Sequence, residues 1–113
     1  MATITPQWTR VSDTITEVLW EACATGDTIL RIAPPTPLCS ISMSGTWGSA
    51  TAKMVGTNDG STLVDINDTD GTAVSLTANG GFNPVAVMWE EIGPSLSGGS
   101  SDDVDILARF VAA

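Results

Sequence analysis

The stretch GTNDGSTLVDINDTDGT, residues Gly56–Thr72, brings four aspartates and three glycines together and is the first candidate for chemistry. Calcium takes oxygen ligands and needs neither His nor Cys. A helix-loop-helix calcium loop requires acidic or amide residues at positions 1, 3 and 5 and Gly at position 6. Counting from Asp65, Thr69 falls at position 5 and Asp70 stands where Gly belongs. We therefore predict no metal site of this type, and a weaker calcium site built from Asp68, Asp70 and carbonyls stays open.

The same stretch also fits two tight turns joined by a short strand. Asn58–Gly60 is typical of a hairpin turn, because Asn and Gly tolerate a positive φ. Asp68–Gly71 would close the next hairpin, with Thr62, Val64 and Ile66 on one face of the strand between. At about 3.3 Å per residue, the two turns would lie roughly 20–30 Å apart. Their acids could then not surround one ion.

Other catalytic constellations find little support in the sequence. It contains no histidine and no tyrosine, which excludes Ser-His-Asp and Cys-His catalysis and His-ligated zinc. Glu90 and Glu91 would point to opposite faces of a strand, whereas Asp103 and Asp105 would share a face about 7 Å apart. Exposed acids of this kind are usually solvated charges, and no nucleotide-binding glycine motif occurs. We predict a protein that is not an enzyme and has no catalytic residues and no cofactor.

The charge balance bears on possible partners. Thirteen acids and four bases give a net charge of −9, which disfavours nucleic-acid binding and suits a positively charged partner surface. No apolar run is long enough to span a bilayer, and residues 1–10 show no secretory signal, so we predict no membrane association. Cys23 and Cys39 are then expected to be reduced and buried, with a disulfide as the alternative.

The hydrophobic pattern has a period of two almost everywhere, as in half-buried strands. Near the C-terminus, apolar residues alternate with mostly charged ones over Asp102–Ala112. Strands are also expected in Thr14–Ala22, Thr28–Ala33, Leu38–Trp47, Ser49–Gly56, Thr72–Ala78 and Asn83–Glu91. A helix over Thr16–Ala24 is an alternative, because Glu, Leu and Ala favour helices.

Turn residues separate these strands at regular spacing. Seven or eight short strands predict an all-β, single-domain antiparallel β-sandwich, either Ig-like or jelly-roll-like, with a small barrel as the alternative. Residues 13–113 would form the sandwich, and residues 1–12 an N-terminal arm or an edge strand. The prolines in Ala33–Pro37 would interrupt pairing between two strands, and Gly93–Ser101 is predicted to be a flexible loop.

The sequence from Ser44 to Gly80 resembles a group of small proteins encoded among the structural genes of tailed bacteriophages. The resemblance rests on Gly45-Thr46-Trp47-Gly48, on Gly56-Thr57-Asn58-Asp59-Gly60 and on Asp68-Thr69-Asp70-Gly71. The Gly26-Asp27-Thr28 turn and the closing strand with Arg109 extend it over most of Thr16–Ala112. One departure is Thr62-Leu63, where the group often has an aromatic residue.

The resemblance implies a decoration, or cement, protein on the exterior of a bacteriophage capsid, assembled in the host cytoplasm. Its partner would be the major capsid protein, and it would form a homo-oligomer, with a trimer as the first expectation. A rigid, acidic scaffold with many weak contacts suits that role. The residues expected at the capsid or oligomer interface are Ile4, Pro6, Trp8, Pro34, Pro35, Pro37 and Leu96.

Two other functions remain open at this point. A carbohydrate-binding or host-attachment module of a fibre would use exposed aromatic rings, which are few in this chain. A neck or tail connector subunit would assemble into rings of six or twelve copies.

Overall fold

The structure, a computed structural model, describes residues 2–112, and these form eleven β-strands and no helix. In chain order the strands are β1 (Thr3–Ile4), β2 (Gln7–Arg10), β3 (Ile15–Cys23), β4 (Thr28–Ile29), β5 (Leu38–Thr46), β6 (Thr51–Thr57), β7 (Val64–Asp65), β8 (Ser75–Leu76), β9 (Gly80–Ala86), β10 (Glu91–Ser97) and β11 (Asp103–Val111). Seven of these strands have four or more residues. The prediction of an all-β fold is confirmed.

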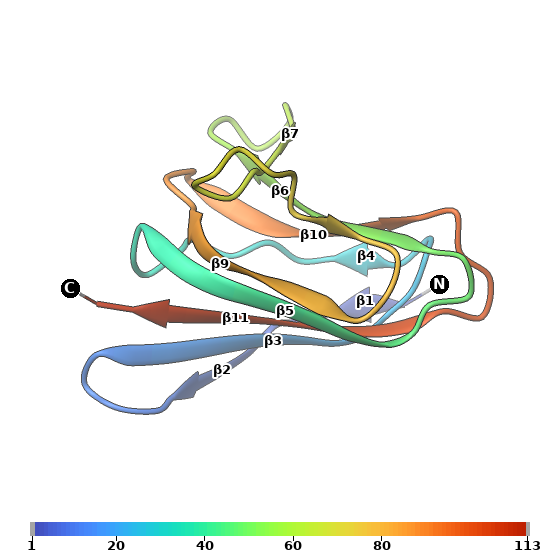
Figure 1. The fold of residues 1–113 in the computed structure, drawn as a ribbon, viewed down its shortest axis with the longest axis horizontal. Coiled ribbons are helices and arrows are strands. Elements are labelled where there is room, and N and C mark those ends of the chain that lie inside the picture. Colours follow the sequence, from blue (N-terminus) through green and yellow to red (C-terminus); the bar gives the residue numbers. More distant parts are fainter. Residues whose placement is uncertain (1, 113) are drawn as a thin grey trace.

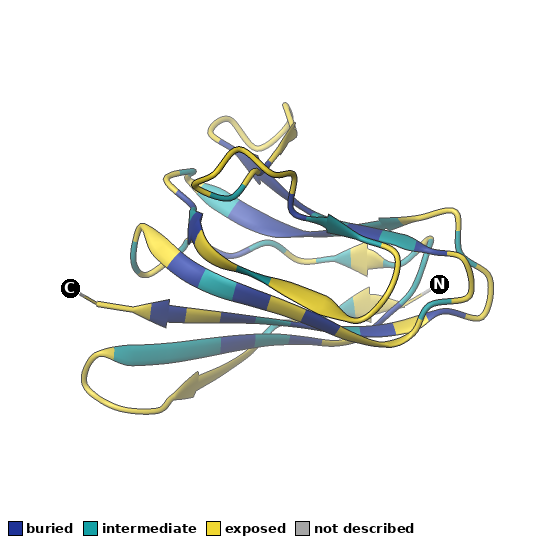
Figure 2. Cartoon of the chain, viewed as in Figure 1, coloured by how far each residue is buried: buried dark blue, intermediate teal, exposed yellow. Residues whose placement is uncertain are grey.

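Five strands form one antiparallel sheet in the order β2-β3-β11-β5-β9 (Figure 1). Its central strand β11 shows why the sequence folds this way. Val104, Ile106 and Phe110 are fully buried, whereas Asp103 and Arg109 lie on the exposed face. Figure 2 shows the same alternation of buried and exposed residues along β5 and β11. The period-two pattern thus gives each strand one core face.

The second sheet is built on β6, which pairs with β10 on one side and with the short strands β7 and β8 on the other. Beyond β10, an isolated bridge joins Ile32 to Ile92. The segment that contains β4 therefore borders β10, and β1 pairs with β4 in parallel. Figure 1 shows this second layer facing the five-stranded sheet.

Successive strands mostly alternate between the two layers. From β3 onward, β3, β5, β9 and β11 lie in the five-stranded sheet, and β4, β6, β8 and β10 lie in the facing layer. The neighbour orders β3-β11-β5-β9 and β4-β10-β6-β8 are those of a jelly roll. The β-sandwich prediction thus holds, and the strand order favours its jelly-roll form over the Ig-like form.

One hydrophobic core fills the space between the layers. Its largest fully buried side chains include Trp20 and Phe110. The Trp20 Nε1 donates a hydrogen bond of 2.9 Å to the Leu30 carbonyl oxygen, so the one polar atom of this indole is satisfied. Trp47 and Trp89 are partly buried against the core.

The N-terminal residues that the structure describes pair with the sandwich. Residues 3–4 form β1 beside β4, and residues 7–10 form β2 at the edge of the five-stranded sheet beside β3. The Ala2 backbone N–H also donates to the Asp27 carboxylate at 2.9 Å. This segment is therefore part of the fold.

One alternative and one prediction about local structure are wrong. The helical alternative for Thr16–Ala24 fails because residues 15–23 form β3. The flexible loop predicted over Gly93–Ser101 fails because residues 93–97 belong to β10, which pairs with β6 throughout. Pro94 has no backbone N–H to donate. It is tolerated because β10 pairs with a regular strand, β6, on one side only, so the other side has no regular ladder of hydrogen bonds to interrupt.

Three predicted strands are shorter than expected. Of residues 28–33, only 28–29 form a strand, and of residues 72–78, only 75–76 do. The strand expected over Asn83–Glu91 is split, because β9 ends at Ala86 and β10 begins at Glu91. Between the two strands, the Glu90 N–H donates a hydrogen bond to the Asn58 side chain. This contact lies just before β10 begins and joins residues far apart in the sequence.

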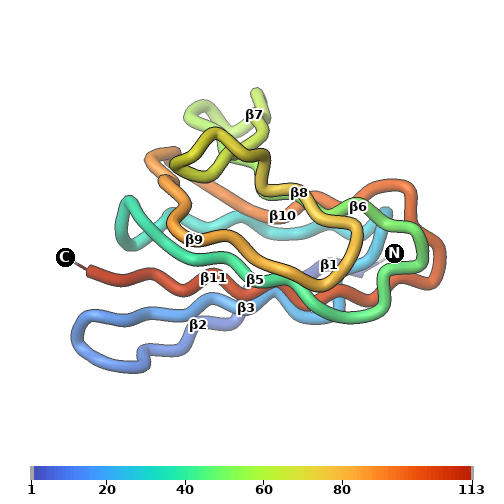
Figure 3. The backbone as a smooth tube through the Cα atoms, viewed as in Figure 1, coloured from blue at the N-terminus to red at the C-terminus, as the bar shows by residue number. Residues whose placement is uncertain are grey.

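Residues 56–72 form a turn, a short strand and a second turn. The Asn58–Gly60 turn connects β6 to β7, and Gly60 has φ 83°. At the second turn, the Gly71 N–H donates to the Asp68 carbonyl oxygen, and Asp68 bridges Val85 of β9. Figure 3 shows the chain between β7 and β8 folding toward β9. The predicted face of Thr62, Val64 and Ile66 is wrong, because β7 has two residues and only Ile66 is buried.

Candidate functional site

The expected N-terminal interface residues differ in accessibility. Ile4 is half-buried and packs against the core, and Pro6 is half-buried between β1 and β2. Trp8 lies opposite Val18 of β3 and is 51% exposed. Because Val18 faces the core, Trp8 lies on the core side of the sheet but at its open edge. Of these three residues, Trp8 offers the largest accessible apolar surface.

The other expected interface residues lie at two places. Pro34 is half-buried, and Pro35 and Pro37 are exposed in the loop that leads into β5, at the end of the sandwich where the C-terminus lies (Figure 1). Leu96 is half-buried in β10 and packs against the core opposite Ala52. The structure therefore does not gather the seven expected residues into one patch.

The paired carboxylates considered for catalysis each have a structural setting. Asp103 and Asp105 share the outer face of β11, and the Asp105 carboxylate accepts a hydrogen bond of 2.8 Å from the Ala22 N–H. Ala22 has φ 57° where β3 bulges opposite β11, so Asp105 holds this bulge in place.

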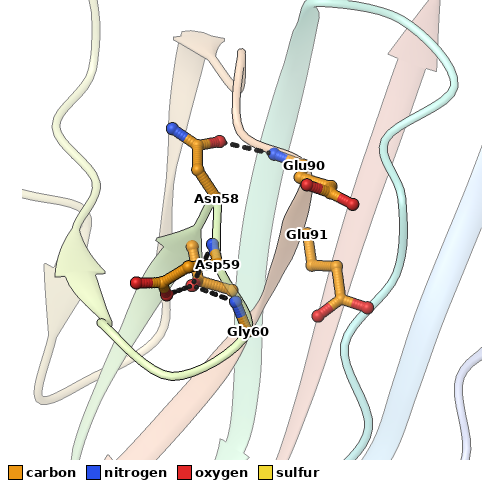
Figure 4. Close-up of a pocket in the computed structure, with 6 residues that line it drawn as sticks. Asn58, Asp59, Gly60, Glu90 and Glu91 are labelled. Atoms are coloured by element: carbon orange, nitrogen blue, oxygen red, sulfur yellow. Dashed lines mark hydrogen bonds between the residues drawn. The ribbon is translucent and has the colours of Figure 1, made fainter.

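A depression of about 220 Å³ lies where the Asn58–Gly60 turn meets the start of β10, and it is lined by Thr57, Asn58, Asp59, Gly60, Glu90 and Glu91. Figure 4 shows the Asp59 carboxylate turned away from those of Glu90 and Glu91. The Thr62 and Ser61 N–H groups donate to Asp59 at 2.7 and 2.9 Å and hold its pKa well below the usual range. The Asp59 carboxylate therefore stabilises the turn in which it lies.

The second acidic turn is organised in a similar way. The Asp68 Oδ1 atom accepts hydrogen bonds of 2.9 Å from the Asp70 N–H and the Thr72 N–H. Such bonds to the backbone are the usual role of Asp in a tight turn. Within residues 2–112, no three His, Cys, Asp or Glu side chains are grouped so that they could hold a metal ion.

The charges of the molecule are distributed unevenly. Each of the four bases is within 4 Å of an acid, in the pairs Arg10–Asp13, Arg31–Glu91, Lys53–Asp65 and Arg109–Glu17. In the part of the chain that the structure describes, nine acids have no such partner: Glu21, Asp27, Asp59, Asp68, Asp70, Glu90, Asp102, Asp103 and Asp105. These nine unpaired acids account for the net charge of −9.

The outer face of the five-stranded sheet carries an apolar surface that the sequence analysis did not identify. We define the apolar face as Ile15 and Leu19 of β3, Leu107 and Val111 of β11, and Leu38 of β5. The sequence shows only part of this surface: Leu107 and Val111 alternate with the same inward-facing residues of β11 as Asp105 and Arg109, so they lie on the outer face with those charges. The other members join them only through the pairing of β3 and β5 with β11. Leu38 and Val111 are 48% and 51% exposed. Beside them, Leu38, Pro84 and Val111 line a shallow depression of about 400 Å³.

Both cysteines are free and buried, as the sequence analysis expects. Burial raises the pKa of the Cys39 thiol to about 12. Burial and the nearby carboxylates of Asp27, Asp105 and Asp103 raise the pKa of Cys23 to about 12 as well. Both thiols are therefore protonated at neutral pH, and they are core residues.

Asp102 joins the loop that follows β3 to the loop that precedes β11, at the end of the sandwich away from the C-terminus. It is 8% exposed, and its Oδ2 atom accepts hydrogen bonds from the Thr25 N–H at 2.9 Å and from the Thr25 hydroxyl at 2.8 Å. The Thr25 hydroxyl oxygen in turn accepts a bond of 3.0 Å from the Gly99 N–H. Burial acts to raise the pKa of Asp102, but the hydrogen bonds from Thr25, together with one from the backbone N–H of Asp102 itself, outweigh burial and lower it.

We predict that the protein loses stability in acid through Asp102. A carboxyl group with a lowered pKa in the folded state stabilises the fold above its unfolded pKa of about 4 and loses this contribution as pH falls through the folded value. We expect Asp102→Asn to unfold at lower urea concentration at pH 7 and to show a smaller loss between pH 7 and pH 2 than the parent. The matched control is Asp103→Asn at the exposed neighbouring position. Equal acid sensitivity of the parent and Asp102→Asn would contradict this prediction.

Comparisons with protein-family models, with curated proteins and with solved structures find no match for this chain. Within residues 2–112, no helix is long and apolar enough to cross a membrane.

Proposed function

We propose that the chain is a non-enzymatic structural protein of a tailed-bacteriophage virion, a decoration or cement protein that binds the exterior of the capsid and stabilises the head. Its partner is the major capsid protein, and it acts as a homo-oligomer, for which a trimer is the first expectation from the resemblance. The observation that carries the proposal is the set of nine unpaired acids on a β-sandwich in which every base is paired.

The unpaired acids provide two surfaces for a basic partner. Four of them, Glu21, Asp27, Asp103 and Asp105, lie where β3 and β11 approach the turns at residues 24–27 and 98–102. Asp102 lies at the same end but is buried. The other four, Asp59, Asp68, Asp70 and Glu90, lie on the turns around the second sheet. Acidic surfaces favour association with basic ones and repel DNA.

The fold suits a role that needs shape rather than chemistry. Turns such as Asn58–Gly60 and Asp68–Gly71 are fixed by side-chain hydrogen bonds to the backbone. A capsid displays the same site many times, so weak contacts act together when copies of the protein are linked. Jelly rolls occur in viral capsid domains and also in lectins, and this analogy of fold does not by itself assign a function.

The proposal predicts salt-dependent binding to capsids that lack this protein. We expect the purified protein to co-sediment with such capsids, to raise their melting temperature and to bind more weakly as salt increases, because salt screens exposed charges. The double variants Glu21→Gln/Asp103→Asn and Asp70→Asn/Glu90→Gln each test one acidic surface. Asp13→Asn is the matched control, because Asp13 is paired with Arg10.

Three results would overturn the proposal. The first is failure to bind capsids that lack the protein, and the second is unchanged capsid stability when it binds. The third is selective binding of the isolated protein to a glycan array, which would favour the carbohydrate-binding alternative. Deletion of residues 1–9 is not a clean test, because it removes β1 and part of β2 from the fold. Trp8→Ala is the better variant for the N-terminal segment.

A further inference from the structure

The apolar face has a regular internal arrangement. Three rows of paired residues cross from β3 to β11 on the outer side of the sheet, namely Ile15 with Val111, Glu17 with Arg109, and Leu19 with Leu107. The first and third rows are apolar, and the middle row is an ion pair with a nitrogen–oxygen distance of 3.7 Å. Leu38 continues the apolar surface onto β5, because it lines the same depression as Arg109 and Val111.

This arrangement is unusual for a solvated sheet face. The outer face of an antiparallel sheet is normally polar when water covers it. Near the chain's C-terminus, the outward side chains of β3 and β11 are aliphatic except for the Glu17–Arg109 ion pair. Toward the other end of the two strands, the same face carries Glu21 and Asp105. Ile15, Leu19 and Leu107 are half-buried, and Leu38 and Val111 beside them are exposed. A contiguous accessible apolar surface of this kind marks an interaction site.

The apolar face is complementary to itself. A two-fold axis that runs along the strands, midway between β3 and β11, would place each β3 residue of one copy over its β11 row partner in the other. Leu19 would then meet Leu107, and Ile15 would meet Val111. In the middle row, Glu17 of each copy would meet Arg109 of the other. A symmetric dimer interface requires this self-complementarity, and two sheets commonly pack with aligned strands in this way.

The charge distribution also favours a second copy over a basic partner at this face. The Arg109–Glu17 pair leaves the apolar face with no net charge, whereas the nine unpaired acids lie elsewhere. A basic partner would find its complement on the acidic surfaces. Two copies of a strongly acidic chain repel each other least where their net charge is zero. Glu21 and Asp105 mark the boundary of the contact, since like charges would face each other there.

The geometry points to a two-fold homodimer in which two copies pack through their apolar faces, with Arg109 of each copy paired to Glu17 of the other. This dimer replaces the trimer that the resemblance alone implies. This contact is independent of capsid binding, because it uses a different surface from the acidic groups. Capsid binding could therefore fail while the dimer forms, and the dimer could fail while capsid binding persists.

Light scattering over a concentration series tests the dimer directly. We expect a molar mass that rises toward twice the 11.6 kDa of the chain. Val111→Lys places a charge in the contact and is expected to weaken the dimer by about tenfold or more. Met88→Lys is the matched control, because Met88 is 80% exposed and lies outside the apolar face, and it should dimerise like the parent.

A charge-reversal pair tests the two-fold arrangement itself. Arg109→Glu gives both copies a negative face, and Glu17→Arg gives both a positive one, so each variant alone is expected to stay monomeric. A mixture of the two variants brings opposite faces together and is expected to form a mixed dimer. Circular dichroism checks that both variants fold, which is expected because an exposed ion pair contributes little to stability.

Each outcome of these experiments either supports or overturns the two-fold dimer. A dimer that Val111→Lys weakens, Met88→Lys spares and the charge-reversed mixture restores supports the inference. A monomer at every concentration, a trimer, or a dimer that Val111→Lys and Met88→Lys affect equally overturns it. A mixture of the charge-reversed variants that remains monomeric also overturns it, provided that both variants are folded.

Discussion

Trp20→Ala is expected to lower the free energy of unfolding by about 3–5 kcal/mol, the usual range for removing a buried aromatic side chain. Trp20 is fully buried, and the substitution leaves a cavity between the two sheets. It also leaves the Leu30 carbonyl oxygen without the hydrogen bond from Nε1. Since small domains are stable by about 5–15 kcal/mol, this loss would bring the protein close to unfolding. Urea denaturation followed by tryptophan fluorescence measures it.

Two further variants separate the causes of this loss. Trp20→Phe keeps most of the buried ring volume and removes the hydrogen bond to Leu30, so we expect a loss about half as large as that of Trp20→Ala. Trp8→Ala is the control for loss of an indole, because Trp8 is 51% exposed at the edge of the sheet. Equal losses for Trp20→Ala and Trp8→Ala would contradict the position of Trp20 in the core.

Gly45→Ala is expected to cost about 3 kcal/mol through steric overlap and backbone strain. Gly45 has φ 141° in β5, opposite Val104 of β11. A Cβ atom at this position would overlap the Asp103 carbonyl oxygen, which belongs to the central strand and cannot move freely. The expected result is a lower urea midpoint with an unchanged slope, because a smaller stability with the same exposed surface shifts only the midpoint.

Gly60→Ala provides the matched control for Gly45→Ala. Gly60 also has a positive φ, of 83°, but a Cβ atom there would meet nothing within 4 Å. Only the cost of the left-handed conformation remains, about 1–2 kcal/mol. If Gly60→Ala were as destabilising as Gly45→Ala, steric overlap with Asp103 would not be the cause at Gly45.

The strands predicted most accurately are those in which apolar and polar residues alternate along the strand itself. In β11 and β5, buried and exposed residues alternate without interruption, so the sequence alone places their faces. In β10 the sequence carries Gly93-Pro94-Ser95, which reads as a loop by composition. Its strand conformation depends on pairing with β6 and on Arg31, whose side chain lies over Gly93, and neither partner is close in sequence.

The acidic stretch at residues 56–72 shows the same division. Its two turns were predictable, because Asn, Asp and Gly favour turns for local reasons. The short strand between them was not, since β7 pairs with β6 over only two residues and Ile66 turns into the core beside Val74. The apolar face was likewise missed, because it depends on which strands become neighbours across β3, β11 and β5.

The sequence by itself determined the all-β class, the alternation of the long strands, the buried cysteines and the acidic surface. These features follow from composition and from interactions between residues close along the chain. The tertiary structure decided the jelly-roll order, the pairing of every base with an acid, and the apolar face with Glu17 and Arg109 at its centre. These depend on the pairing of β3 with β11, which brings residues about ninety positions apart into register, and local sequence patterns do not specify such distant pairings.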